Sequence, residues 1–201
     1  MIKTIIFDMG GVILLNDINQ VYIQLAKSLN ISGDALVKLI KKNRLDFMNG
    51  KFTGKKFSLL IKKHFNLLNN VETIMQYWKN AFEDLMVVNQ ELINTLPKLK
   101  KNYIVCMVTD VPELHAKINK NKGLYNQFKP CILSSDVGFV KPQKEIFKLA
   151  IDELQLDPKD CIFIDDERAN IQIGKKFGFK TILFKDNNQL FKDFRKLEVK
   201  I

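Results

Sequence analysis

Residues 5–12 read IIFDMGGV, in which a short apolar run leads directly into Asp8 and a pair of glycines. An uninterrupted apolar run of this length is typical of a strand in a parallel sheet that is covered on both faces. An ionised carboxylate at the end of such a strand is costly unless it is paired or bound to a metal. Asp8 is therefore either a functional group at a sheet edge or the cap of a tight turn, and both interpretations stay open on this segment alone.

Further runs of strand length occur at residues 103–108, 131–133, 161–164 and 181–184, and the first run extends over 2–7. The segments between the later runs, 112–121, 143–154 and 167–177, carry apolar residues at the spacing of amphipathic helices. Alternating strand and helix signals predict βαβ units. We therefore expect an α/β fold with a doubly wound, Rossmann-like parallel sheet.

The interval from Phe7 to Tyr103 does not follow this alternation, because it is far longer than the roughly thirty residues of a βαβ unit. Its apolar spacing is helical throughout, and residues 90–101 are the expected crossover helix. We predict a core of residues 1–16 and 87–201, with a helical cap of residues 17–86 inserted after the first strand. Such an insertion would lie above the carboxyl ends of the strands, where open α/β sheets bind ligands.

A second strand also ends in carboxylates, because residues 161–166 read CIFIDD. Adjacent acids raise one another's pKa unless a cation is present. Asp8, Asp165 and Asp166 at one sheet edge would supply the hard oxygen ligands that suit Mg²⁺. The alternative is that one acid caps the helix beginning near Glu167, but capping explains one acid and not both.

Two more segments place polar groups near the same edge. Thr109 directly follows the run 103–108 and can donate a hydrogen bond to a phosphate oxygen. Lys141 precedes Pro142, which we expect in the first turn of the helix 143–154. A lysine fixed there would neutralise carboxylates crowded against a phosphoryl group.

Taken together, these segments resemble the four motifs of the haloacid dehalogenase superfamily in their usual order. They are the Phe7-Asp8-x-Gly10-Gly11-Val12 run, the strand ending in Thr109, Gly138-x-x-Lys141-Pro142, and Asp165-Asp166-x-x-x-Asn170. The last motif and the helical insert look like the branch that holds bacterial sugar-phosphate phosphatases and the phosphatase domain of soluble epoxide hydrolase. The resemblance covers nearly the whole chain and implies a five-stranded sheet in the order 3-2-1-4-5.

The resemblance also implies a role for each matched residue. Asp8 would be the nucleophile and, with the carbonyl of Gly10 and with Asp166, a ligand of Mg²⁺, with Asp165 close by or acting through water. Thr109 and Lys141 would bind the transferring phosphoryl group. The expected activity is a Mg²⁺-dependent phosphohydrolase that acts on a small phosphorylated metabolite, a sugar phosphate being one candidate, through an aspartyl-phosphate.

Two positions depart from the family pattern. Most phosphatases of the superfamily have an aspartate, acting as general acid and base, where this chain has Gly10. The residue after Thr109 is Asp110, a negative charge that we expect to turn toward solvent, as we expect His115 to lie on the surface. An alternative function is therefore a catalytically weak member that binds Mg²⁺ and phosphate. A metal-free dehalogenase is disfavoured, because Asp165 and Asp166 would burden an anion site that has no metal.

The composition and the distribution of charge bear on the partners and the location of the protein. The formal net charge is +10, but the lysines are scattered in pairs without aromatic interleaving, so we expect no nucleic-acid partner. No apolar run has the length of a membrane span, and the three cysteines have no metal-like spacing, so we expect a cytoplasmic protein. Selectivity would come from cap side chains near residues 16–17 and 44–57. The sequence names neither the substrate nor the oligomeric state.

Overall fold

The computed structural model describes residues 1–201 and contains one five-stranded parallel sheet. The strands are β1 (Thr4–Phe7), β2 (Ile104–Thr109), β3 (Cys131–Leu133), β4 (Cys161–Asp165) and β5 (Lys180–Leu183). Their order is β3-β2-β1-β4-β5, which confirms the expected order 3-2-1-4-5. Phe7 is in register with Met107 and with Ile164, so Asp8 and Asp165 follow neighbouring strands at the same edge.

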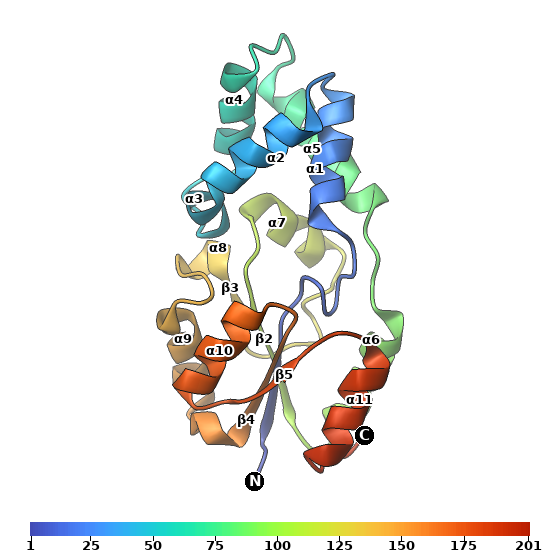
Figure 1. Ribbon diagram of the computed structural model, residues 1–201, viewed down its shortest axis with the longest axis vertical. Helices are drawn as coiled ribbons and strands as arrows, with labels where there is room; N and C mark the ends of the chain where they lie inside the picture. Colours follow the sequence, from blue (N-terminus) through green and yellow to red (C-terminus); the bar gives the residue numbers. More distant parts are fainter.

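Helices cover both faces of the sheet (Figure 1). One face packs against α6 (Gln90–Leu99) and α11 (Asn187–Lys196), and the other packs against α9 (Lys144–Leu154) and α10 (Arg168–Phe177). Side chains alternate between these faces along β1, because Ile5 and Phe7 belong to one apolar cluster and Ile6 to the other. A strand buried on both faces explains why β1 reads as a continuous apolar run.

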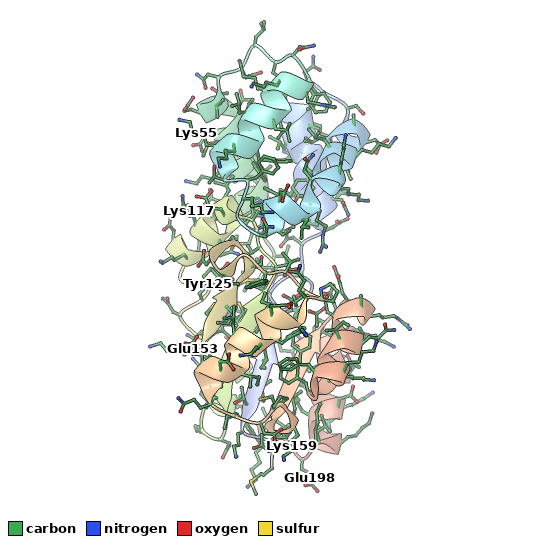
Figure 2. All side chains as sticks on the ribbon, turned by 90° about the vertical axis from the view of Figure 1, so that its left-hand side faces the viewer. Lys55, Lys117, Tyr125, Glu153, Lys159 and Glu198 are labelled. Atoms are coloured by element: carbon green, nitrogen blue, oxygen red, sulfur yellow. The ribbon has the colours of Figure 1, made fainter.

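The long interval after β1 is helical, as its apolar spacing predicts. It forms α1 (Ile18–Ser28), α2 (Gly33–Lys42), α3 (Arg44–Met48), α4 (Gly54–His64) and α5 (Val71–Asp84), which we call the cap. Four of these helices begin at a polar side chain that accepts a backbone N–H, namely Asp17, Ser32, Thr53 and Asn70. The cap lies at one end of an elongated molecule, with Lys55 in the cap and Lys159 at the opposite end (Figures 1 and 2).

Buried aromatic rings form the centre of the cap. Phe47 stacks on Phe57 and on Trp78, with ring centroids 4.5 and 5.2 Å away, and Phe57 and Trp78 also contact each other. One apolar cluster of 40 buried residues runs from these rings through α5 and α7 (Glu113–Asn121) to the sheet. The predicted division of the chain at residues 16/17 and 86/87 remains a prediction.

The two segments that connect the cap to the sheet are bonded to each other. Leu15 donates its N–H to the carbonyl of Val87, and Asn89 donates its N–H to the carbonyl of Ile13, each at 2.8 Å. The buried Asn89 side chain also donates to the carbonyl of Val12 at 2.9 Å. The return from the cap is thereby fixed to the loop that follows Asp8.

Some of the contacts between the cap and the core use main-chain groups of the cap. The Gly54 N–H donates to the Glu113 carboxylate at 2.9 Å, and the Met48 carbonyl accepts from the Ser134 hydroxyl at 2.7 Å. Ser134 begins the short helix α8 (Ser134–Val137). Gly50 has a φ of +78°, and a Cβ there would overlap the Ser135 carbonyl. No helix of the structure combines the length and the apolar character that a membrane span requires.

Candidate active site

A pocket of about 380 Å³ lies where the carboxyl ends of β1 and β2 meet α1, α5 and α7. Its size is in the range of small-molecule sites. Five of the six residues that the sequence predicts as functional line it, and these are Asp8, Gly10, Thr109, Lys141 and Asp166. The sixth, Asp165, is fully buried beside them. The structure therefore brings together the side chains of all four sequence motifs.

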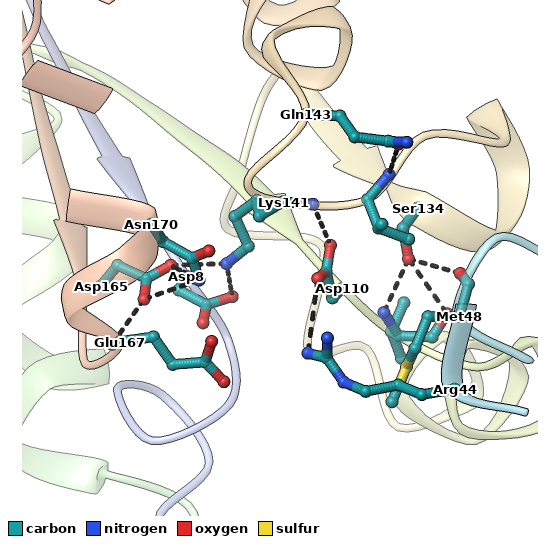
Figure 3. Close-up of polar contacts among 12 residues, drawn as sticks. Asp8, Arg44, Met48, Asp110, Ser134, Lys141, Gln143, Asp165, Glu167 and Asn170 are labelled. Carbon is teal, nitrogen blue, oxygen red and sulfur yellow. Dashed lines mark hydrogen bonds and ion pairs between the residues drawn. The ribbon is translucent and has the colours of Figure 1, made fainter. Parts of the chain in front are cut away.

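The Lys141 ammonium lies between two carboxylates (Figure 3). Its Nζ is 2.8 Å from Asp8 Oδ1 and 2.6 Å from Asp165 Oδ2, and the lysine side chain is almost entirely buried. Burial disfavours the charged amine, but the carboxylates of Asp8 and Asp165 outweigh it and raise the pKa of Lys141. Lys141 is therefore a fixed positive charge.

Asp8 offers one free oxygen to the pocket. Its Oδ1 accepts from the Met9 N–H at 2.7 Å as well as from Lys141, whereas Oδ2 accepts no hydrogen bond within the protein. Burial raises the pKa of Asp8 to about 7, with Asp165 adding to the rise and Lys141 opposing it. A carboxyl group with this pKa is about half ionised at neutral pH, and a further cation nearby would favour its ionised form.

Hydrogen bonds fix the buried Asp165 carboxylate beside the pocket. Its carboxylate accepts from the Asn170 amide at 3.1 Å on both oxygens and from the Glu167 N–H at 2.7 Å. Together with the contact to Lys141, these bonds occupy both oxygens of Asp165. The side chain therefore orients Lys141 while contributing its negative charge to the site.

Asp166 faces the pocket and completes a cluster of acids. Burial and the neighbouring Asp165 raise the pKa of Asp166. One carboxylate oxygen from each of Asp8, Asp165 and Asp166 lies within 4.8 Å of the others. A Cβ at Gly11, whose φ is +70°, would overlap the Asp166 carboxylate, so only glycine leaves room for it. Hard oxygen donors in this grouping fit Mg²⁺.

Asp110 does not turn to solvent, so that prediction was wrong. Its side chain is 10% exposed, its Oδ1 accepts from the Lys141 N–H at 2.9 Å, and its Oδ2 lies 3.9 Å from Arg44 Nη2 (Figure 3). Burial raises the pKa of Asp110, and Lys141 and Arg44 oppose the rise. Asp110 thus links the backbone that carries Lys141 to an arginine of the cap.

Pro142 lies outside the helix that follows it, contrary to the expectation. The helix α9 begins at Lys144 with Gln143 as its N-cap, and the Lys141–Pro142 peptide bond is cis. Gln143 instead accepts the Val140 N–H through its side chain at 2.9 Å. Lys141 is therefore positioned by a turn and by Asp110 rather than by the first turn of α9.

His115 is buried, whereas the sequence favoured a surface position. Its ring stacks on Phe82 with centroids 3.8 Å apart and meets Trp78 edge to face at 5.6 Å. Burial lowers the pKa of His115 to about 3, so the imidazole is neutral. Sequence reasoning also missed Tyr22 and Asn119, which line the pocket and look like ordinary helix positions in the sequence.

The comparisons with known proteins agree with this geometry. Residues 2–178 match the family model described as haloacid dehalogenase-like hydrolase. The D-ribitol-5-phosphate phosphatase of Bacteroides thetaiotaomicron is 28% identical over 90% of this chain and 91% of its own length. The bifunctional epoxide hydrolase 2 of Sus scrofa is 22% identical over 98% of this chain, which spans 39% of that protein.

A solved structure shows the same fold. The HAD family enzyme of B. thetaiotaomicron, in complex with magnesium and inorganic phosphate, superposes with a TM-score of 0.78. It is 22% identical and covers 95% of this chain and 100% of its own. The family model matches well over half of the residues and includes all four motifs. The resemblance and the expected hydrolase class are thereby confirmed, and the chain belongs to the haloacid dehalogenase-like hydrolase family.

Proposed function

We propose that this protein is a Mg²⁺-dependent phosphohydrolase that acts on small phosphorylated metabolites through an aspartyl-phosphate on Asp8. The observation that carries the proposal is the placement of the Asp8 carboxylate. One of its oxygens is held by Lys141 and by the Met9 N–H, and the other is free at the base of the pocket. A fixed carboxylate with one free oxygen suits nucleophilic catalysis.

Three groups support a Mg²⁺ site beside the nucleophile. Asp8 and Asp166 offer carboxylate oxygens, and Asp165 holds a further negative charge close by. The Gly10 carbonyl accepts no hydrogen bond within the protein, so it is free to act as a ligand. Bound Mg²⁺ would neutralise charge on the phosphoryl oxygens.

The chain's own residues account for the rest of the reaction. Asp8 Oδ2 attacks phosphorus, the bond to the ester oxygen breaks, and the alcohol leaves with a proton taken from solvent. Lys141 and Thr109 would hold the phosphoryl oxygens, and no protein hydrogen bond occupies the Thr109 hydroxyl. Water then attacks the aspartyl-phosphate, releasing phosphate and restoring Asp8. Such a loose transition state depends mainly on positioning and charge neutralisation.

A second candidate follows from Gly10, which carries no side chain to donate or accept a proton. The protein would then bind Mg²⁺ and phosphate but turn over slowly. The similarity to the D-ribitol-5-phosphate phosphatase of B. thetaiotaomicron favours the first candidate. The same similarity makes sugar phosphates a candidate substrate class.

The test is release of inorganic phosphate from a panel of phosphorylated metabolites with Mg²⁺ present. Asp8→Asn should lower turnover by on the order of 10⁴-fold or more, while the far-ultraviolet circular dichroism stays that of the wild type. Asp34→Asn, the same chemical change at an exposed position that does not line the pocket, is the matched control. Substantial turnover by folded Asp8→Asn would exclude the covalent route. Halide release from 2-haloacids without Mg²⁺ would instead point to a dehalogenase.

A further inference from the structure

Four of the nine buried side-chain atoms that lack a hydrogen-bond partner belong to residues that line the pocket, on both its cap side and its core side. Buried side-chain atoms without a hydrogen-bond partner include Tyr22 Oη, His115 Nε2, Asn119 Oδ1 and Asn16 Oδ1, and all four of these residues line the pocket. Tyr22, His115 and Asn119 are 3%, 2% and 1% exposed, respectively. Buried polar groups in proteins are nearly always bonded, so unpaired ones that line a pocket beside a catalytic group are candidates for contacts with a bound ligand.

The surrounding contacts fix where these atoms lie. The His115 ring is held between Phe82 and Trp78, and it is neutral, so it offers one donor and one acceptor. Asn119 donates its amide N–H to the Tyr125 hydroxyl at 3.2 Å, which leaves Oδ1 as the acceptor without a partner. Burial raises the pKa of Tyr22, so its hydroxyl stays protonated. These three side chains are neutral, and together they can both donate and accept hydrogen bonds.

Charge in the pocket is unfavourable for a second anionic group. The acids that line it are Asp8, Asp17, Asp110, Asp166 and Glu167, against only two cations, Arg44 and Lys141. Both cations already have carboxylate partners, because Lys141 lies between Asp8 and Asp165 and Arg44 lies 3.9 Å from Asp110. A carboxylate or a second phosphate on the leaving group would meet net negative charge.

We propose that Tyr22, His115 and Asn119 form a subsite for the hydroxyl groups of a neutral, polyhydroxylated leaving group. The substrates are then polyol or sugar monophosphates, and bisphosphates and phosphorylated acids are rejected. Two of these residues come from α7 of the core and one from α1 of the cap, so the subsite lies where the cap meets the core. This inference rests on the proposed phosphohydrolase function.

Three substrates of equal chain length test the subsite. They are a pentitol 5-phosphate, pentyl phosphate, which lacks the hydroxyls, and a pentonate 5-phosphate, which ends in a carboxylate. Each hydrogen bond to a neutral group is worth roughly two- to tenfold in affinity. We expect kcat/KM for the pentitol phosphate to exceed that for pentyl phosphate by about a hundredfold and to exceed that for the pentonate phosphate as well.

Tyr22→Phe removes one oxygen and should lower the pentitol-to-pentyl ratio of kcat/KM by roughly two- to tenfold. His115→Leu, of similar volume, should lower it by a similar factor. Tyr77→Phe, a half-buried cap tyrosine that does not line the pocket, is the matched control and should leave the ratio unchanged. Calorimetric binding of the three compounds to Asp8→Asn gives the same ranking without turnover.

The results of these experiments test the phosphohydrolase function and the hydroxyl subsite separately. Failure of the wild type with Mg²⁺ to hydrolyse p-nitrophenyl phosphate or any panel member overturns the phosphohydrolase function, and the binding series still tests the subsite. Equal handling of pentitol and pentyl phosphates overturns the subsite while hydrolysis stands. The subsite is also overturned if neither Tyr22→Phe nor His115→Leu, each in folded protein, lowers the pentitol-to-pentyl ratio of kcat/KM.

Discussion

At Gly10 the φ angle is not positive, and no atom lies within 4 Å of the position that a Cβ would take. An aspartate therefore fits at Gly10 without strain. Positioned acid–base catalysis is typically worth about 10²- to 10⁴-fold, and this chain lacks the carboxylate that would supply it at Gly10. Protonation of the leaving oxygen and activation of water then depend on solvent.

Slow hydrolysis of the phosphoenzyme is the expected result. We predict a burst of p-nitrophenol followed by a lower steady rate, and we predict that Gly10→Asp raises the steady rate by up to about 10²-fold. Rapid-quench measurement of the two phases is the direct check. A linear time course in the wild type, with a rate that Gly10→Asp leaves unchanged or lowers, would mean that another residue already supplies the proton.

A second prediction concerns the carboxylate of Asp110. Its Oδ1 accepts from the Lys141 N–H, which an asparagine oxygen can also do, whereas the charge contact with Arg44 needs the carboxylate. Asp110→Asn should therefore keep Lys141 in place and remove one negative charge from the pocket. We expect inorganic phosphate to inhibit Asp110→Asn at roughly tenfold lower concentration, measured as Ki, with kcat changed only a few-fold. A collapse of kcat would instead make Asp110 the missing acid.

Among the elements, α3 and α4 meet the core at two glycine-containing turns. Gly50 has a φ of +78° and contacts the Ser135 carbonyl so closely that a Cβ would displace it. At Gly54 the Leu114 Cβ lies 3.1 Å from the position of a Cβ, a tight contact that small shifts relieve. The docking of the cap on α7 and α8 therefore depends most on Gly50.

Gly50→Ala should push the cap away from α8 and disturb the pocket that cap and core line together. We expect kcat/KM to fall about tenfold or more, because the pocket places Tyr22 of the cap opposite the catalytic residues of the core. Gly123→Ala is the control, since Gly123 also has a positive φ, +71°, but contacts only the flexible Asn126 side chain. Equal losses of activity in the two variants would attribute the effect to backbone strain alone.

For the whole molecule, stability should depend on Mg²⁺ and pH together. The pKa of Asp8 is raised by burial from its ordinary value of 3.8 to about 7. In the metal-free protein this group's contribution to stability is therefore greatest below about pH 4 and is lost as the pH rises to 7. Binding of Mg²⁺ requires the ionised carboxylate, so affinity should rise by up to tenfold per pH unit below 7.

Thermal unfolding measures this linkage directly. At a fixed Mg²⁺ concentration, the increase in Tm over the metal-free protein should be larger at pH 8 than at pH 5.5. Asp166→Ala should remove most of the increase and can raise the Tm of the metal-free protein by relieving repulsion with Asp165. An undiminished Mg²⁺ shift in Asp166→Ala would exclude Asp166 as a ligand.

Much of the fold was predictable because its determinants are local. Apolar runs gave β1 through β5 to within a few residues, and the ends of parallel strands converge, which placed Asp8 and Asp165 together. The positions of Asp110 and His115 were not predictable in the same way. Asp110 is held by the Lys141 N–H and by Arg44 of the cap, and His115 packs against Phe82 and Trp78 of the cap. Contacts between distant segments leave no periodic signal in the sequence.

The docking of the cap through the Met48 carbonyl, the bare Cα of Gly50 and the Gly54 N–H has a consequence for protein engineering. Main-chain groups are the same in every sequence, so exposed cap side chains other than Arg44, which pairs with Asp110 of the core, can be exchanged without rebuilding these docking contacts. A library that randomises those side chains, with both glycines retained, should yield mostly folded variants. Including the pocket-lining cap residues Ile18 and Met48 would place part of the diversity at the pocket, where new leaving groups can be selected.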